Sequence, residues 1–186
     1  MQDNPLSEIS LPARVALRDG RQVVLRKIRE EDKAGLLAAF DRLSADSRYT
    51  RFMASLRELP EAMLESATHP APELECALVA IYGDAQSIVG GARYAAAPGS
   101  DVCEFAVTID DEWHGLGLAR CLMQVLIAAA RARGYRTMEG YVLASNTGMR
   151  GLARRLGFVD TACHEDATLR VVSLGLTEAA GAPAPG

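Results

Sequence analysis

The sequence lacks the residue patterns of metal-binding, nucleic-acid-binding and membrane-spanning proteins. Its four cysteines include no C-x-x-C pair and its three histidines have no zinc-ligand spacing, so we expect no metal site. A formal net charge of −4 provides no positive field to attract nucleic acid or an anionic membrane. The chain has neither a secretion signal at its start nor an apolar run near the length of about 20 residues that spans a bilayer. These absences predict a cytoplasmic protein whose partners are small molecules or other proteins.

Length and composition describe one folded domain. The chain has 186 residues, of which 49% are hydrophobic, enough to bury a single core. Residues 1–20 are mixed in character and carry two prolines, so we expect a surface arm there and the folded domain over residues 21–176. Residues 177–186 are dominated by alanine, glycine and proline, which predicts a disordered tail.

The spacing of apolar residues predicts an α/β fold. Strands are expected over residues 21–28, 74–83, 87–97, 102–109, 136–144, 158–165 and 167–176. Helices are expected over residues 29–44, 45–67 with a break at Pro60, 115–134 and 146–157. The run of three strands requires antiparallel pairing, whereas the strand-helix-strand unit from Val102 to Ala144 should be parallel. We therefore predict a central mixed, mostly antiparallel sheet with helices on both faces.

Two glycines, Gly115 and Gly117, stand at the start of the longest predicted helix, with no Ser, Thr, Asp or Asn immediately before them to cap it. Free N–H groups at the positive end of a helix favour a bound phosphate. A nucleotide P-loop is excluded because its lysine and hydroxyl residues are missing. A dinucleotide loop fits poorly because Arg120 replaces its third glycine, although Glu139 lies near the place of its ribose-binding acid. A plain turn, in which glycine serves geometry alone, stays open.

The segment HGLGLA, residues 114–119, resembles the pyrophosphate loop of the GNAT acyltransferases, whose pattern is Q/R-x-x-G-x-G/A. Here His114 takes the first position. The segment ASNTGMRGLARRLGF, residues 144–158, is similar to the next motif of that family, and the order of elements agrees as well. The resemblance implies the GNAT fold, in which two neighbouring strands splay apart and hold acyl-CoA. It also implies acetyl-CoA as the co-substrate, with no metal.

Residues 17–53 are similar to the opening of the GNAT domain of Pat-type bacterial protein lysine acetyltransferases. The S-x-x-S-x-Y-x-R-F run of that subfamily appears here as Ser44, Ser47, Tyr49, Arg51 and Phe52. This segment borders the acceptor site in the GNAT fold, so the resemblance implies that Tyr49, Arg51 and Phe52 sense the substrate. Core packing explains Tyr49 and Phe52 equally well, and that alternative stays open.

The resemblance also assigns the cofactor contacts. Main-chain groups of Val107, Thr108 and Ile109 would bind the pantetheine arm of coenzyme A. The pyrophosphate would lie within the loop of His114, Gly115, Leu116, Gly117, Leu118, Ala119 and Arg120. Asn146, which opens the next helix, is expected as a side-chain ligand, and it also fits an ordinary helix cap. A group of arginines on that helix could meet the 3′-phosphate or form a solvated face.

Glu104 is the candidate catalytic residue. Alternation along residues 102–109 places Cys103 on the apolar face of the strand and Glu104 on the other. A carboxylate on a covered strand needs water, a partner or a cleft. In the Pat-like pattern the general base is a glutamate ten residues before the loop, where Glu104 stands relative to His114. The resemblance therefore implies that Glu104 removes the proton from the attacking amine, since an ammonium has no lone pair. A solvated or salt-bridged glutamate is the alternative.

The acceptor is the open part of the functional prediction. We expect an N-acetyltransferase that acts on a primary amine, with a protein lysine as the expected acceptor. A small amine such as a polyamine, an amino acid or an aminoglycoside is the alternative, and Glu58, Glu61 and Glu65 hint at an acidic mouth that would suit polycations. Many GNAT enzymes carry a proton-donating tyrosine where this sequence has Ala153, so a non-catalytic acyl-CoA sensor also stays open. A homodimer is left open as well.

Overall fold

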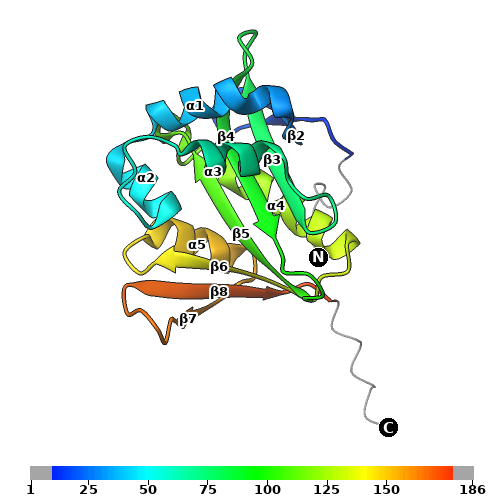
Figure 1. Cartoon of the computed structure of the whole chain (residues 1–186), viewed down its shortest axis with the longest axis vertical. Coiled ribbons are helices and arrows are strands. Elements are labelled where there is room, and N and C mark those ends of the chain that lie inside the picture. Colours follow the sequence, from blue (N-terminus) through cyan, green and yellow to red (C-terminus); the bar gives the residue numbers. More distant parts are fainter. Residues whose placement is uncertain (1–9, 178–186) are drawn as a thin grey trace.

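The computed structural model of the protein describes residues 10–177. Within them, eight strands form one sheet in the order β1-β2-β3-β4-β5-β6-β8-β7 (Figure 1). The strands are β1 (Ala13–Ala16), β2 (Gln22–Lys27), β3 (Glu75–Tyr82), β4 (Ser87–Ala95), β5 (Val102–Ile109), β6 (Thr137–Leu143), β7 (Val159–Ala162) and β8 (Leu169–Gly175). The helices are α1 (Lys33–Arg42), α2 (Ala45–Phe52), α3 (Glu61–Thr68), α4 (Leu118–Ala132) and α5 (Thr147–Arg155), with short 3-10 helices η1 (Glu30–Asp32) and η2 (Asp111–Trp113).

The sheet is mixed and mostly antiparallel, as the sequence predicts. Every neighbouring pair of strands is antiparallel except β5 and β6, which run parallel because the crossover helix α4 joins them. The predicted parallel unit is therefore confirmed.

Helices cover both faces of the sheet, and β3 shows why. Its residues alternate between two cores, with Leu78 and Ala80 in the larger core beneath α4 and Val79 and Ile81 in a smaller one against α1. Figure 1 shows α1 and α3 on one side of the strands and α4 on the opposite side. A strand buried on both faces reads as a continuous apolar run, which is how residues 76–81 appear in the sequence.

The predicted surface arm requires a correction. Residues 13–16 form β1, which pairs antiparallel with β2, and the side chains of Val15 and Leu17 are buried in the larger core. The short alternation around Val15 was too brief to indicate a strand without its partner, since a strand end gains its stability from pairing. Residues 1–9 of the predicted arm, and residues 178–186 of the predicted tail, lie outside the described residues.

The start of α4 also differs from the prediction. We expected the helix to begin at Gly115, but it begins at Leu118, because Gly115 and Gly117 adopt positive φ angles of 75° and 92°. Such angles are incompatible with a right-handed helix and favour glycine. The break near Pro60 is longer than expected, since α2 ends at Phe52 and Pro60 is the N-cap of α3.

Candidate functional site

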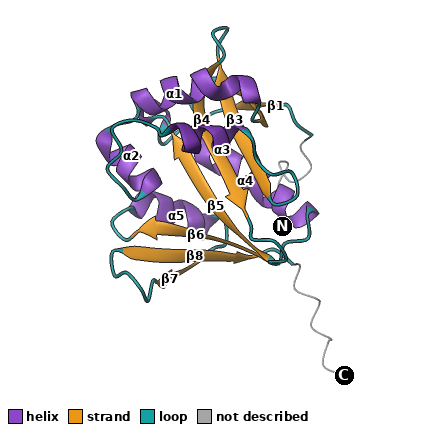
Figure 2. Cartoon of the chain, in the orientation of Figure 1, coloured by secondary structure: helices purple, strands orange, loops and turns teal. Residues whose placement is uncertain are grey.

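The central feature of the site is a split between β5 and β6. The two strands pair over only three positions, ending at Glu104 opposite Glu139. Beyond that point β5 continues along β4 as far as Ile109, and β6 continues along β8 as far as Leu143. Figure 2 shows the two strands meeting at one end and diverging toward α2 and α5. Main-chain groups on both edges of this gap are therefore free from pairing with the other strand, which suits an extended ligand that bonds as a strand would.

The glycine loop lies at the C-terminal end of β5. Gly117 is the N-cap of α4, and its lack of a side chain leaves the first N–H groups of this 15-residue helix without a side-chain cap. The ring of His114 donates from Nε2 to the main-chain oxygen of Ile109 at 3.0 Å, because a carbonyl can only accept. The ring therefore anchors the loop to β5, and the main-chain oxygen of Ile109 is already bonded.

A cationic side chain that the sequence analysis missed lies against this loop. The main-chain N–H of Arg18 donates to Leu116 at 3.1 Å, and its guanidinium donates to the main-chain oxygen of Gly115 at 3.2 Å. Arg18 comes from the turn after β1, in the segment that we expected to be an arm. Nothing in the local sequence pattern links residue 18 to residue 115, because the contact depends on how β1 pairs.

The same turn contacts the buried tryptophan ahead of the loop. The guanidinium of Arg21 lies 3.9 Å from the centre of the Trp113 ring, and Tyr82 meets that ring edge-on at 4.7 Å. Trp113 is only 6% exposed. It is therefore a packing residue that holds the loop in place.

Glu104 projects from β5 on the side of the sheet that carries α2. Its side chain is exposed at the strand split, and within residues 10–177 it makes no hydrogen bond or ion pair. Partial desolvation in the cleft raises the pKa of Glu104 and the facing Glu139 raises it further, while Arg51 acts in the opposite direction. A raised pKa moves a carboxylate toward the range in which a general base is effective.

Arg51 and Arg93 border the same cleft, which has a volume of about 390 Å³. Arg93 donates to Glu75 at 3.0 Å, so its charge is compensated. Arg51 has no such partner among the described residues, and burial together with the nearby Arg93 lowers its pKa to about 10. Arg51 therefore remains a cation at neutral pH, within Coulomb range of Glu104.

Helix α2 is tied to the glycine loop through its serines. Ser44 caps α2 by accepting from Ser47 at 3.1 Å, and its own N–H donates to Asp111 at 2.7 Å. The hydroxyl of Ser47 also donates to Asp111. Burial raises the pKa of Asp111, but the hydrogen bonds from Ser47 and Ser44 outweigh it and leave that pKa below the usual value. The serines of the S-x-x-S run thus connect the predicted acceptor segment to η2, which directly precedes the predicted cofactor loop.

The other two residues of that run occupy different environments. Phe52 packs against Phe40 with ring centres 5.8 Å apart, which supports the core-packing interpretation for Phe52. Tyr49 is 45% exposed, so core packing does not explain it.

The residues at the start of and along α5 have three different roles: capping the helix, packing in the core and forming ion pairs. Asn146 is the N-cap, and its side-chain oxygen accepts from Met149 at 3.0 Å while its amide NH₂ group has no partner among the described residues. Ala153, which replaces the usual tyrosine, is fully buried and offers no proton donor. Arg150 and Arg154 both bind Asp160, so they form neither a free phosphate site nor a purely solvated face.

The structure also bears on other kinds of site in this region. Glu139 lies opposite Glu104 on the neighbouring strand β6. This position is away from the place that the ribose of a dinucleotide would occupy. Cys103 is fully buried, and burial raises the pKa of its thiol to about 11, so it is no nucleophile. Within residues 10–177 no group of three metal-ligating side chains gathers, and no helix is long and apolar enough to cross a membrane. The cytoplasmic location and the homodimer stay predictions.

Comparison with known proteins identifies the family. The model of the acetyltransferase (GNAT) family matches residues 37–158, which include the second half of α1, the strand split, the glycine loop and α5. The chain belongs to the GNAT acetyltransferase family. "Acetyltransferase PA5475" of Pseudomonas aeruginosa is 37% identical over 163 residues, covering 87% of this chain and 88% of the relative. The GNAT assignment from the sequence is thus confirmed.

Solved structures show the same fold. The GNAT domain of S. lividans PAT superimposes with a TM-score of 0.81 at 27% identity, covering 88% of this chain and 96% of that domain. The structure of yncA from Salmonella typhimurium, described as a putative acetyltransferase with its cofactor acetyl-CoA, superimposes with a TM-score of 0.66 at 20% identity over 88% of this chain and 99% of that one. The first comparison confirms the Pat-type resemblance, and both confirm the GNAT fold.

Proposed function

We propose that this GNAT enzyme transfers the acetyl group of acetyl-CoA to a primary amine, with Glu104 as the general base. The observation that carries the proposal is the position of Glu104. It is an exposed carboxylate at the end of the β5–β6 pairing, where the strands separate, and it is free of hydrogen bonds within the described residues.

The chain fits coenzyme A along the whole length of the split. The uncapped N–H groups after Gly117, together with Arg18, suit the pyrophosphate. Main-chain groups of Val107 face the split and suit the pantetheine arm, whereas those of Thr108 point toward Gly91 of β4 and the oxygen of Ile109 is bonded to His114. The free amide NH₂ of Asn146 can donate to the same arm. The loop from His114 to Arg120 contributes main-chain groups, since the side chain of Leu118 is buried in the core.

Glu104 supplies the proton acceptor for the reaction. The thioester of acetyl-CoA presents a carbonyl carbon for attack, and the amine must be neutral to attack it. Glu104, held ionised in part by Arg51, takes the proton from the ammonium, directly or through water. The N–H groups near Val107 are placed to stabilise the negative charge that develops on the carbonyl oxygen. The carbon–sulfur bond then breaks, and the nitrogen gives its second proton to solvent as the amide forms. The thiolate of coenzyme A leaves and takes a proton from solvent, since Ala153 offers none.

A protein lysine is the proposed acceptor, and two observations support it. The first is the similarity to Pat-type protein lysine acetyltransferases over residues 17–53. The second is the charge of the cleft, where Glu104 and Glu139 lie side by side and only Arg51 is uncompensated, which suits one ammonium. Polyamines and aminoglycosides receive less support, because the cleft is bordered by arginine and Glu65 is already paired with Lys33 and His69.

Two measurements on the intact protein test this function. At acetyl-CoA near 100 times Kd, linkage stabilises the folded state by about 2.7 kcal/mol, which is worth roughly 5 to 11 °C in the unfolding midpoint. NAD serves as the control ligand and is expected to give no shift. Amine-dependent release of the coenzyme A thiol then separates an enzyme from a sensor. A midpoint shift without thiol release from any lysine peptide or small amine would support the sensor, and no shift would remove the cofactor site.

A further inference from the structure

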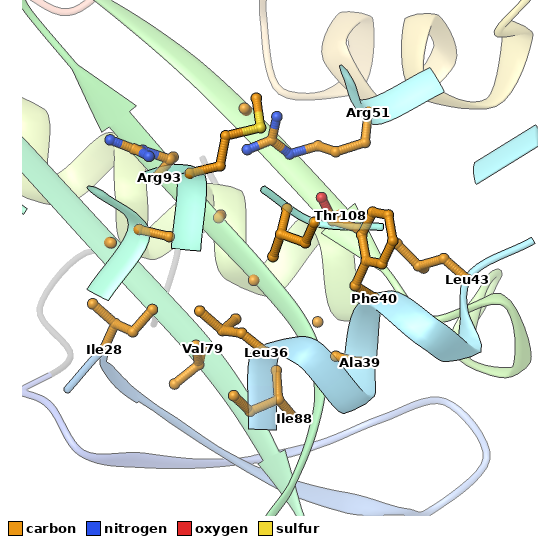
Figure 3. A pocket seen from close by; sticks show the side chains of 18 of the residues that line it. Ile28, Leu36, Ala39, Phe40, Leu43, Arg51, Val79, Ile88, Arg93 and Thr108 are labelled. Carbon is orange, nitrogen blue, oxygen red and sulfur yellow. The ribbon is translucent and has the colours of Figure 1, made fainter. Parts of the chain in front are cut away.

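A second pocket lies next to the Glu104 cleft, between the sheet and helices α1, α2 and α3. Its volume is about 460 Å³ (Figure 3). Pockets in this size range usually bind part of a small molecule.

The lining of this pocket is mainly apolar. The side chains that Figure 3 shows around it include Ile28, Leu36, Phe40, Leu43, Val79 and Ile88. Asp110 also borders it, but its carboxylate is bonded to Arg42 at 2.7 Å and is therefore neutralised. Such a lining stabilises an apolar group of a ligand, because the group leaves water for an apolar environment.

The pocket reaches the reaction centre along β5. Ala106 lines both this pocket and the Glu104 cleft, and Thr108 lines the pocket two residues further along the same face. These residues flank Val107, where the proposed function places the thioester. Gly91, opposite Thr108 in β4, also lines the pocket and presents no side chain to it.

We propose that this pocket receives the acyl chain of the donor, so that the enzyme binds and transfers saturated medium-chain acyl groups as well as acetyl. The inference rests on the proposed function and adds the class of its donor. An acetyl group has a single methyl, which leaves nearly all of the pocket empty. A longer acyl chain that extends from the thioester past Thr108 would fill the pocket with methylene groups.

Charge distinguishes the acyl chain from the body of the acceptor. Figure 3 shows Arg51 and Arg93 at the same end of the pocket, and both also border the Glu104 cleft. An acceptor that carries an ammonium would have to pass Arg51, whose charge has no ion-pair partner among the described residues, and like charges disfavour this. A neutral hydrocarbon chain passes without that cost.

The transfer keeps the chemistry of the acetyl reaction. One ammonium proton passes to Glu104, and the neutral amine nitrogen then bonds to the thioester carbonyl carbon. The carbon–sulfur bond breaks, and the second proton passes from the nitrogen to solvent as the amide forms. The products are a longer N-acyl amide and coenzyme A, with the thiol proton supplied by solvent. The step therefore needs no oxidant, reductant or further reactant.

Binding of three thioesters to the intact protein is the first test. Kd is measured by calorimetric titration for acetyl-, butyryl- and hexanoyl-CoA, with unacylated coenzyme A as the reference. Full burial of each methylene would tighten binding by about fourfold, and ordering of the chain offsets part of this. We expect hexanoyl-CoA to bind about 30-fold more tightly than acetyl-CoA. Equal affinity for acetyl- and hexanoyl-CoA would overturn the pocket assignment while leaving the acetyltransferase intact. Failure of all three thioesters to bind would instead overturn the proposed function.

A pair of variants on one helix tests whether the acyl chain lies in this pocket. Ala39 lines the pocket and Ala38 is exposed on the same helix. Ala39→Leu should remove the gain from hexanoyl-CoA and leave acetyl-CoA binding unchanged, whereas Ala38→Leu should keep the gain. Ala67→Leu, on the α3 wall, repeats the test if Ala39→Leu does not fold. If hexanoyl-CoA still binds more tightly than acetyl-CoA in both pocket-filling variants, the acyl chain lies elsewhere and the proposal is overturned.

Discussion

Two clusters of charged residues in this protein differ in whether their central carboxylate is paired. At Asp160 the carboxylate is 6% exposed and is bonded by Arg150, Arg154 and Arg170 at 2.9, 3.0 and 2.7 Å. At the strand split, Glu104 is exposed and makes no hydrogen bond or ion pair among the residues described, although Arg51 and Glu139 lie within Coulomb range. One carboxylate is satisfied by the fold itself, while the other is left for a ligand.

The contrast shows how a structural carboxylate differs from a chemical one. The bonds to Arg170, Arg150 and Arg154 lower the pKa of Asp160 far below its usual value, which makes it a very weak base. Partial desolvation and Glu139 raise the pKa of Glu104, which makes it a stronger one. Raised pKa values in a cleft are typical of functional sites, whereas closed ion-pair networks are typical of structural ones.

The largest effect expected from this comparison is on stability. Replacing Asp160 by asparagine leaves three guanidinium groups without their counter-charge, so the free energy of unfolding should fall by about 2 kcal/mol. Urea denaturation of the wild type and the variant at neutral pH measures this difference. Amine-dependent thiol release by the folded variant should stay near the wild-type value. Loss of activity without loss of stability would contradict the division of roles.

The pH dependence of that difference follows from the depressed pKa of Asp160. A carboxylate with a depressed pKa stabilises the fold at pH values above its unfolded pKa of about 3.9, and the stabilisation is lost as the pH falls through the folded pKa. The gap between wild type and Asp160→Asn should therefore be full at neutral pH and shrink in strong acid.

The next effect concerns the cofactor loop. Arg18→Ala removes a cation from beside the loop but keeps the main-chain bond to Leu116, so KM for acetyl-CoA should rise about tenfold with kcat unchanged. Steady-state kinetics measures the change. Arg14→Ala is the matched control, because Arg14 is an exposed arginine of β1 with no bonded partner in residues 10–177. An equal rise in both variants would show a general charge effect instead of a local contact.

The smallest effect is a pair of opposite shifts in the pH profile. Glu139 raises the pKa of Glu104 and Arg51 lowers it. Because the base must be ionised, kcat/KM falls as the pH drops through that pKa. Glu139→Gln should move this acid limb to lower pH, and Arg51→Gln should move it to higher pH. Shifts in the same direction would mean that another group controls the limb.

Local pattern was sufficient for much of the fold. The strand over Val102–Ile109 was predicted with its observed bounds, because an apolar alternation is ended by Asp101 and Asp110. The parallel unit followed from the length of its crossover. By contrast, β1 was missed, because its four residues form a strand only through pairing with β2.

The sequence predicted individual residues of the candidate site but not which other residues lie near them in the fold. Glu104 and the loop could be named, since their spacing along one strand and turn is local. Arg18, Arg93 and Glu139 were missed as site residues because strand register brings them there, and register is not readable from periodicity alone. The pocket beside Thr108 could not be predicted for the same reason, since it depends on how three helices lie over the sheet.

The most direct test of the central claim is a parallel measurement on Glu104→Gln. The variant keeps the size of the side chain and removes its basicity, so the unfolding midpoint should rise with acetyl-CoA as it does for the wild type. Amine-dependent thiol release at saturating acetyl-CoA near neutral pH should fall by about 100-fold or more. Release at the wild-type rate would contradict the assignment of Glu104 as the base.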